Sequence, residues 1–176
     1  MYPIASQTVG SGGASSITFN SIPSTFTHLQ LRMFVQTNRA TYGIDQLRLT
    51  INGDTSSTYY AHELYGDGSS ASSNTDSNNY ILLGNGNSAG TGAGGTFSNV
   101  ITDILDYTST NKAKTFRSIC GVDINGTIAG YGGRVGLSSA SWQNSSTAIS
   151  SIKIAPDSGT LLNQYTTFQL YGITTA

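Results

Sequence analysis

Apolar and polar residues alternate with a period of two along most of the chain. In the clearest run, residues 27–36, every second residue is apolar: Leu29, Leu31, Met33 and Val35. Successive side chains of a β-strand point to opposite faces, so this period predicts a strand with one apolar and one polar face. A sheet built from such strands buries one face on a core and exposes the other to solvent.

Similar runs predict strands over much of the remaining sequence. The longer ones cover residues 46–51, 116–124, 152–154 and 166–171. Shorter candidates cover residues 4–9, 16–19, 59–65, 80–83, 97–105 and 134–139. No apolar stripe with a spacing of three or four persists over several turns, so the pattern does not favour helices.

The segments between these runs carry turn and loop chemistry. Asn52-Gly53 and Asn125-Gly126 predict tight turns at strand ends, because both residue types tolerate a positive φ. Residues 67–79 and 85–95 are rich in Gly, Ser and Asn and predict long loops. The whole pattern predicts one all-β domain over residues 1–176, an antiparallel β-sandwich of about ten strands and of jelly-roll type.

The charge content is low for a chain of this length. Charged residues make up 10% of the 176 residues, and the net charge is −1, whereas roughly 25% is usual for soluble domains. The eight basic residues are scattered, but neutralising nucleic-acid phosphates needs several that converge. The composition therefore argues against a nucleic-acid partner.

The sequence contains neither a disulfide framework nor a membrane signal. Cys120 is the only cysteine, which excludes an intrachain disulfide and a thiolate metal cluster. It lies in the apolar row of its strand, so we expect it to be buried as a small hydrophobe. No signal peptide and no long apolar run are present, so we expect no membrane partner and synthesis in a cytoplasm.

The histidines offer little for nucleophilic catalysis. His28 lies on the polar side of the 27–36 run, and His62 stands beside Glu63, the only glutamate. A Ser-His-Asp triad needs a nucleophile held on a strained turn, and the chain has no Gly-x-Ser-x-Gly elbow. We therefore expect both histidines to be ordinary strand-surface residues.

The carboxylates also lack a catalytic pattern. Glycoside hydrolysis needs two carboxyl groups on either side of the bond that is cleaved. Asp103 and Asp106 are three residues apart, which places them on opposite faces of a strand. Glu63 could pair only with an Asp that is distant in sequence. The expectation is a protein that is not an enzyme, with Glu63 and His62 as the main challenge to it.

Two stretches in the long loop offer oxygen ligands for a metal ion. They are Asp67-Gly68 and Asp76-Ser77-Asn78. Neither has the EF-hand order of acidic residues, central glycine and terminal glutamate. A turn rich in Asx residues is the favoured interpretation, so no metal site and no cofactor are expected.

Aromatic residues remain as candidates for a binding surface, because exposed aromatic side chains stack on sugar rings or anchor protein interfaces. The candidates for such a ligand or interface surface are Tyr59, Tyr60, Tyr65, Tyr80 and Trp142. The four tyrosines flank the long loop. Tyrosine is also an ordinary strand residue, so a purely structural role is the alternative.

Five segments spread from one end of the chain to the other share a further character. They are residues 4–19, Ser21-Ile22-Pro23, Leu29-Gln30-Leu31-Arg32, residues 47–54 and Leu170-Tyr171-Gly172-Ile173. Together they resemble a small domain that is widespread in virion proteins of tailed bacteriophages. The resemblance spans nearly the whole chain, although the middle loops look individual, and it transfers no catalytic residue.

The resemblance implies a β-sandwich on the outside of a phage particle. Similar domains serve as capsid cement (decoration) proteins, commonly as homotrimers, or as distal domains of tail fibres and tailspikes. A fibre subunit needs an attachment region, and strand-like sequence here begins at Ile4. We therefore expect a cement protein that is made in the bacterial cytoplasm and lies on the virion surface. Its expected partners are further copies of itself, the major capsid protein and a host surface glycan.

The alternative is a receptor-binding tip of a tail fibre or tailspike. Such a tip would recognise host surface polysaccharide through the tyrosine-rich loops. Both uses need a rigid sandwich and no catalytic residue.

Overall fold

The computed structural model describes the whole chain except residues 41, 89–94, 129–130 and 175–176. Twelve strands run through the described residues: β1 (Tyr2–Thr8), β2 (Ile17–Phe19), β3 (His28–Thr37), β4 (Ile44–Ile51), β5 (Tyr59–Gly66), β6 (Ala71–Asn78), β7 (Ile81–Ser88), β8 (Ser98–Leu105), β9 (Lys114–Ile128), β10 (Tyr131–Trp142), β11 (Ile152–Pro156) and β12 (Thr167–Ile173). No helix long and apolar enough to cross a membrane occurs in this part of the chain.

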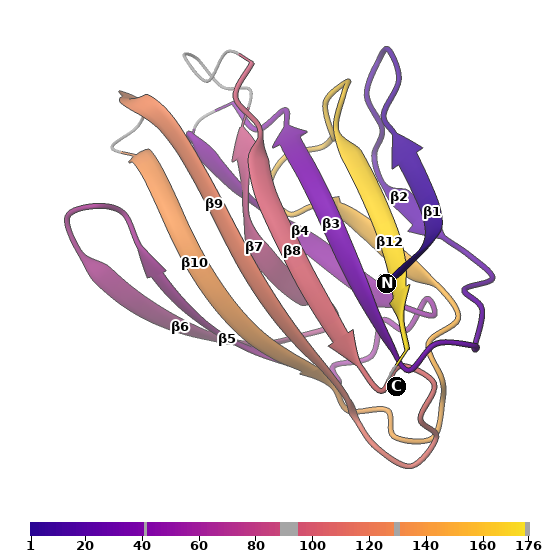
Figure 1. Ribbon diagram of the computed structural model, residues 1–176. Coiled ribbons are helices and arrows are strands. Elements are labelled where there is room, and N and C mark those ends of the chain that lie inside the picture. Colours follow the sequence, from indigo (N-terminus) through magenta and orange to yellow (C-terminus); the bar gives the residue numbers. More distant parts are fainter. Residues whose placement is uncertain (41, 89–94, 129–130, 175–176) are drawn as a thin grey trace.

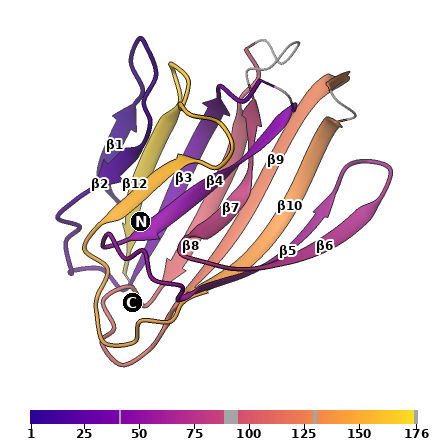
Figure 2. The same ribbon diagram turned by 180° about the vertical axis from the view of Figure 1, so that it is seen from behind.

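The strands form two sheets that pack against each other (Figures 1 and 2). The smaller sheet has the order β2-β11-β4-β7, and the larger has the order β1-β12-β3-β8-β9-β10-β5-β6. All pairs are antiparallel except a short parallel pairing of residues 36–37 in β3 with residues 87–88 in β7, where the two sheets meet. The predicted all-β fold and antiparallel β-sandwich are confirmed.

The chain passes repeatedly from one sheet to the other. The strands β2, β4, β7 and β11 belong to the smaller sheet, and the segments between them belong to the larger one. Such crossings are typical of Greek-key sandwiches. The larger sheet carries eight strands, more than one half of an eight-stranded jelly roll, and the jelly-roll type stays a prediction.

The core lies between the sheets and is built by the alternating residues. In β3 the four apolar residues of the predicted strand, Leu29, Leu31, Met33 and Val35, are buried, and Leu47, Leu49 and Ile51 of β4 face them from the smaller sheet. Cys120 is buried, as expected. Two polar side chains inside pair with each other: Thr102 and Ser118 share a hydrogen bond of 2.8 Å.

The prediction of a long loop over residues 67–79 is wrong, because most of this segment forms strand β6. This strand pairs with β5 along eight residues and lies at the edge of the larger sheet. Most of its side chains are polar and none of its residues is fully buried. It therefore lacks the apolar alternation by which a strand is recognised in a sequence. In Figure 1 the β5–β6 hairpin projects beyond β10.

The tight-turn predictions have mixed outcomes. Asn52-Gly53 forms the turn after β4, with φ values of 52° and 70°. Asn125-Gly126 does not end its strand, because β9 continues to Ile128 and pairs with β10. Strand β7 likewise extends to Ser88, into the second predicted loop; residues 89–94 of that loop lie outside the described residues. Long antiparallel pairing holds these Gly/Asn-rich segments extended.

Candidate functional site

Two of the five aromatic candidates lie in the core. Tyr59 and Trp142 are each 1% exposed, and their rings stack at 6.4 Å. Both are held by Asp54: the Tyr59 hydroxyl donates to its carbonyl (2.9 Å) and Trp142 Nε1 to its carboxylate (2.7 Å). Burial raises the pKa of Tyr59 to about 12. The prediction that these two belong to an exposed surface is therefore wrong.

The other three aromatic candidates do not form one surface. Tyr60 is 46% exposed and points away from the core on β5. Tyr65 is partly buried, with the guanidinium of Arg134 at 4.2 Å from its ring. Tyr80, which precedes β7, lies 4.6 Å from the guanidinium of Arg48. A ligand role for each of them stays a prediction.

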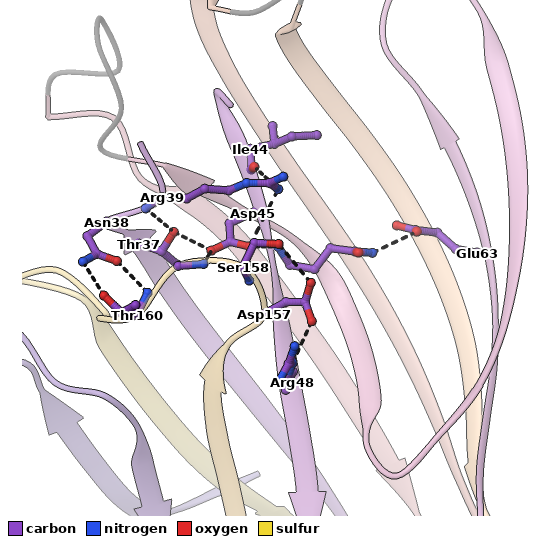
Figure 3. Close-up of polar contacts among 12 residues, drawn as sticks. Thr37, Asn38, Arg39, Ile44, Asp45, Arg48, Glu63, Asp157, Ser158 and Thr160 are labelled. Carbon is purple, nitrogen blue, oxygen red and sulfur yellow. Dashed lines mark hydrogen bonds and ion pairs between the residues drawn. The ribbon is translucent and has the colours of Figure 1, made fainter. Parts of the chain in front are cut away.

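The neighbours His62 and Glu63 point to opposite faces of β5. His62 is exposed, whereas Glu63 is partly buried and accepts a hydrogen bond of 3.3 Å from the side chain of Gln46 (Figure 3). The two therefore do not act on a common point. Among the described residues, no group of three or more His, Cys, Asp or Glu side chains is placed to hold a metal ion.

The other catalytic candidates lie in polar contacts at the surface. Arg117 donates to Asp103 at 2.7 Å, and Lys112 donates to Asp106 at 3.0 Å. The hydrogen bond from Lys112 lowers the pKa of Asp106. His28 Nδ1 accepts a hydrogen bond from the Asp106 backbone N–H (3.0 Å). These contacts join strand ends and neighbouring strands, and all the groups are at least partly exposed.

Asp67 forms a tight turn between β5 and β6, as the Asx-turn interpretation predicts. Its Oδ1 accepts hydrogen bonds from the backbone N–H groups of Ser69 (2.9 Å) and Ser70 (2.8 Å). Gly68 has a φ of +88°, a conformation that is costly for other residues. The backbone hydrogen bonds lower the pKa of Asp67.

A buried carboxylate organises one end of the sandwich (Figure 3). Asp45 of β4 accepts hydrogen bonds from Thr37 Oγ1 (2.8 Å) and from the backbone N–H groups of Ser158 (3.0 Å) and Gly159 (2.9 Å). Arg39 Nη1 lies 4.0 Å from it. Because the side chain of Asp45 is fully buried, these donors replace the hydrogen bonds that it would make to water.

The segment after β11 has two further attachments in the same region. The side-chain oxygen of Asn38 accepts hydrogen bonds from the backbone N–H groups of Thr160 (2.8 Å) and Leu161 (2.9 Å). Asp157 pairs with Arg48 at 2.7 Å, and this hydrogen bond raises the pKa of Arg48. The contacts fix residues 157–161 against β3 and β4, so we interpret the Asp45 network as structural.

A more promising surface lies on the outer face of the larger sheet, the face turned away from the smaller sheet. Here β5, β9 and β10 expose four aliphatic side chains: Leu64 (57%), Ile119 (54%), Val135 (60%) and Leu137 (48%). The register places Ile119 opposite Leu137 and Leu137 opposite Leu64. These four residues, the aliphatic patch, line a depression of about 310 Å³. Contiguous exposed apolar surface of this kind marks interaction sites.

The prediction of site residues missed this patch. In the sequence, each patch residue is an aliphatic residue at a solvent-facing position of the alternation. Ile119, for example, lies between Ser118 and Cys120, which both point inward. A single such residue is unremarkable. Only the pairing of three strands shows that several of them meet.

Comparison of the sequence with family models and with curated proteins gives no relative. No family model matches the chain, and no curated protein matches it. The resemblance to phage virion domains therefore stays a prediction.

Proposed function

We propose that the protein is a structural component of a tailed-bacteriophage particle, a cement protein on the outer surface of the capsid. It stabilises the shell by binding further copies of itself and the major capsid protein. The observation that carries the proposal is the aliphatic patch. Four aliphatic side chains that are about half exposed on the face of a regular sheet would be unfavourable in water, and burying them against a partner is favourable.

Three further features support the proposal. The resemblance of residues 4–19 and 47–54 to virion domains concerns the same kind of particle. The Asp45 network fixes residues 157–161 on the sandwich, which suits a rigid bridging element. Contacts that are weak one by one act together when symmetry repeats them over a shell.

The test is the position of the chain on the particle. Cryo-EM of purified virions is expected to place density for this sandwich between neighbouring capsid subunits, with the outer face of β5, β9 and β10 in a contact. Density for this chain at the tail alone would contradict the proposal. The mass of the purified protein in solution tests the homotrimer separately.

The alternative function is a receptor-binding tip that recognises host polysaccharide. The observation in its favour is the exposure of aromatic side chains on the outer face of the larger sheet, Tyr60 (46%) and Phe34 (50%). Binding of host polysaccharide by the purified protein that is lost in Tyr60→Ala, together with density at the tail, would favour this alternative. Tyr59 is unsuitable for such a test because it is a core residue.

A further inference from the structure

A row of residues that lie opposite one another crosses the outer face of the larger sheet. In register from β12 to β5, the row consists of Thr167, Phe34, Asn99, Gly121, Val135 and Gly66. Five steps of about 4.8 Å between neighbouring strands give the row a length of about 24 Å. Because the ladder of six strands holds the row, its shape is rigid.

Two depressions lie along this row, and a third adjoins them at Phe97. The largest has a volume of about 930 Å³ and extends from the Asp67 turn to Phe97. Phe97 also lines a second depression of about 410 Å³, and Asn99 also lines a third of about 230 Å³. Because neighbouring depressions share a lining residue, the three adjoin one another, and we term them together the crossing groove.

Two glycines leave the floor of the crossing groove open. A Cβ on Gly121 would meet only the backbone oxygen of Arg134, at 3.8 Å, and a Cβ on Gly66 would lie 3.6 Å from the backbone oxygen of Ser70. Both are ordinary van der Waals distances, and neither glycine has a positive φ. Neither packing nor backbone conformation therefore requires glycine here, and the missing side chains leave space that a ligand can fill.

An aromatic pair lies where the depressions meet. The rings of Phe34 and Phe97 stack with their centroids 5.2 Å apart and an interplanar angle of 11°. Phe34 is 50% exposed because it lies on the solvent side of β3. A flat, exposed aromatic surface of this kind suits stacking against the apolar face of a planar or ring-shaped ligand.

Groups that form hydrogen bonds lie along the crossing groove. The amide of Asn99 and the carboxylates of Asp67 and Asp123 line the largest depression, and together they provide donors and several acceptors. Arg134 is its one cationic lining residue among the described residues, and its guanidinium lies on the Tyr65 ring. A polyanion would need converging cations, and a wholly apolar ligand would desolvate the carboxylates without compensation.

A neutral ring with an apolar face and hydroxyl groups at its edge fits the groove, because the face stacks on the aromatic pair and the hydroxyl groups form hydrogen bonds with the polar lining. We propose that the crossing groove binds a neutral oligosaccharide, with one sugar ring stacked on the Phe34–Phe97 pair and the next over Gly121. The sugar ends short of Val135, which belongs to the aliphatic patch and is covered when the patch binds a partner. The part of the row from Thr167 to Gly121 accommodates more than one ring. The site is distinct from the five aromatic residues that the sequence suggested.

The test is the binding of neutral oligosaccharides to the full chain. An array carries malto-, cello- and chito-oligosaccharides together with neutral fragments of bacterial surface polysaccharides. We expect the unchanged protein to bind at least one of them. Phe34→Ala removes the stacking surface and Gly121→Leu fills the floor, and each is expected to weaken binding by about tenfold or more. Gly121→Leu also guards against misinterpretation of Phe34→Ala if the latter is poorly folded.

Ser139→Leu is the matched control, because it adds the same side chain on the outer face of β10, away from the row. It is expected to bind as the unchanged protein does, and thermal unfolding establishes that all three variants are folded. Absence of binding to every neutral oligosaccharide would overturn the proposal, as would binding that Gly121→Leu leaves unchanged. The position of the chain on the virion is measured separately. Absence of oligosaccharide binding therefore does not contradict the cement proposal, and a position at the tail does not contradict oligosaccharide binding.

Discussion

Gly84 of β7 packs directly on Cys120 of β9, at a point where the smaller sheet approaches the larger one. A Cβ on residue 84 would overlap the Cys120 sulfur and lie 2.5 Å from the Cys120 Cβ. The Cys120 thiol is buried and donates to the Gly136 carbonyl oxygen at 3.6 Å. The lack of a side chain at residue 84 therefore allows the two sheets to come together here.

Replacing this glycine is expected to destabilise the sandwich. Gly84→Ala forces a methyl group into an occupied space, and overpacking of this kind costs about 1–3 kcal/mol. Urea unfolding measures the loss. Gly10→Ala is the control, because a Cβ there meets nothing within 4 Å. Cys120→Gly should recover part of the loss in the Gly84→Ala background, and equal stability of the two alanine variants would contradict the close packing.

The Asp45 network provides a second prediction. Asp45→Ala leaves the hydroxyl of Thr37 and the N–H groups of Ser158 and Gly159 without their acceptor. The Thr37 hydroxyl is buried, and an unsatisfied buried group costs about 1–3 kcal/mol. Hydrogen exchange at Ser158 and Gly159 should accelerate. Asp157→Ala removes the partly exposed pair with Arg48 and an exposed hydrogen bond from the Ser158 hydroxyl, which we expect to cost about 1 kcal/mol or less. Equal losses in the two variants would be inconsistent with this role of Asp45.

The aliphatic patch is expected to support self-association. Leu137→Lys places a charge at its centre, and burying an unpaired charge is strongly unfavourable. The variant should therefore sediment as a smaller species than the unchanged protein at the same concentration. Leu105→Lys is the matched control, because Leu105 is 43% exposed and lies outside the patch. An unchanged oligomeric state in Leu137→Lys would rule out the patch as the self-association surface.

Acid is expected to weaken the fold partly through Asp54. Hydrogen bonds from Ser56, and then from Trp142, lower the pKa of this carboxyl group in the folded protein. The unfolded chain therefore binds the proton more readily, so the free energy of unfolding falls as the pH drops below about 4, the ordinary Asp range, through the lowered pKa. Urea unfolding between neutral and acid pH should give a flatter pH dependence for Asp54→Asn. Parallel curves for the variant and the unchanged protein would disprove the linkage.

Local alternation was sufficient to predict most of the strands and their inward residues. The burial of Leu29, Leu31, Met33 and Val35 follows from the period of two alone, as does that of Cys120. The Asn52-Gly53 turn follows from local backbone preferences. These features depend on residues within a few positions of one another, so they can be predicted from the sequence.

The tertiary structure decided what depends on neighbours distant in sequence. Strand β6 exists because β5 pairs with it, although its own residues are nearly all polar. The burial of Tyr59 and Trp142 required a partner in Asp54, and was not visible in their residue types. The aliphatic patch and the crossing groove arise from the register of separate strands, because a shift of one residue would turn each of these side chains to the other face. The sequence alone thus determined which side chains share a face of each strand, whereas only the pairing of the strands determined which of them meet.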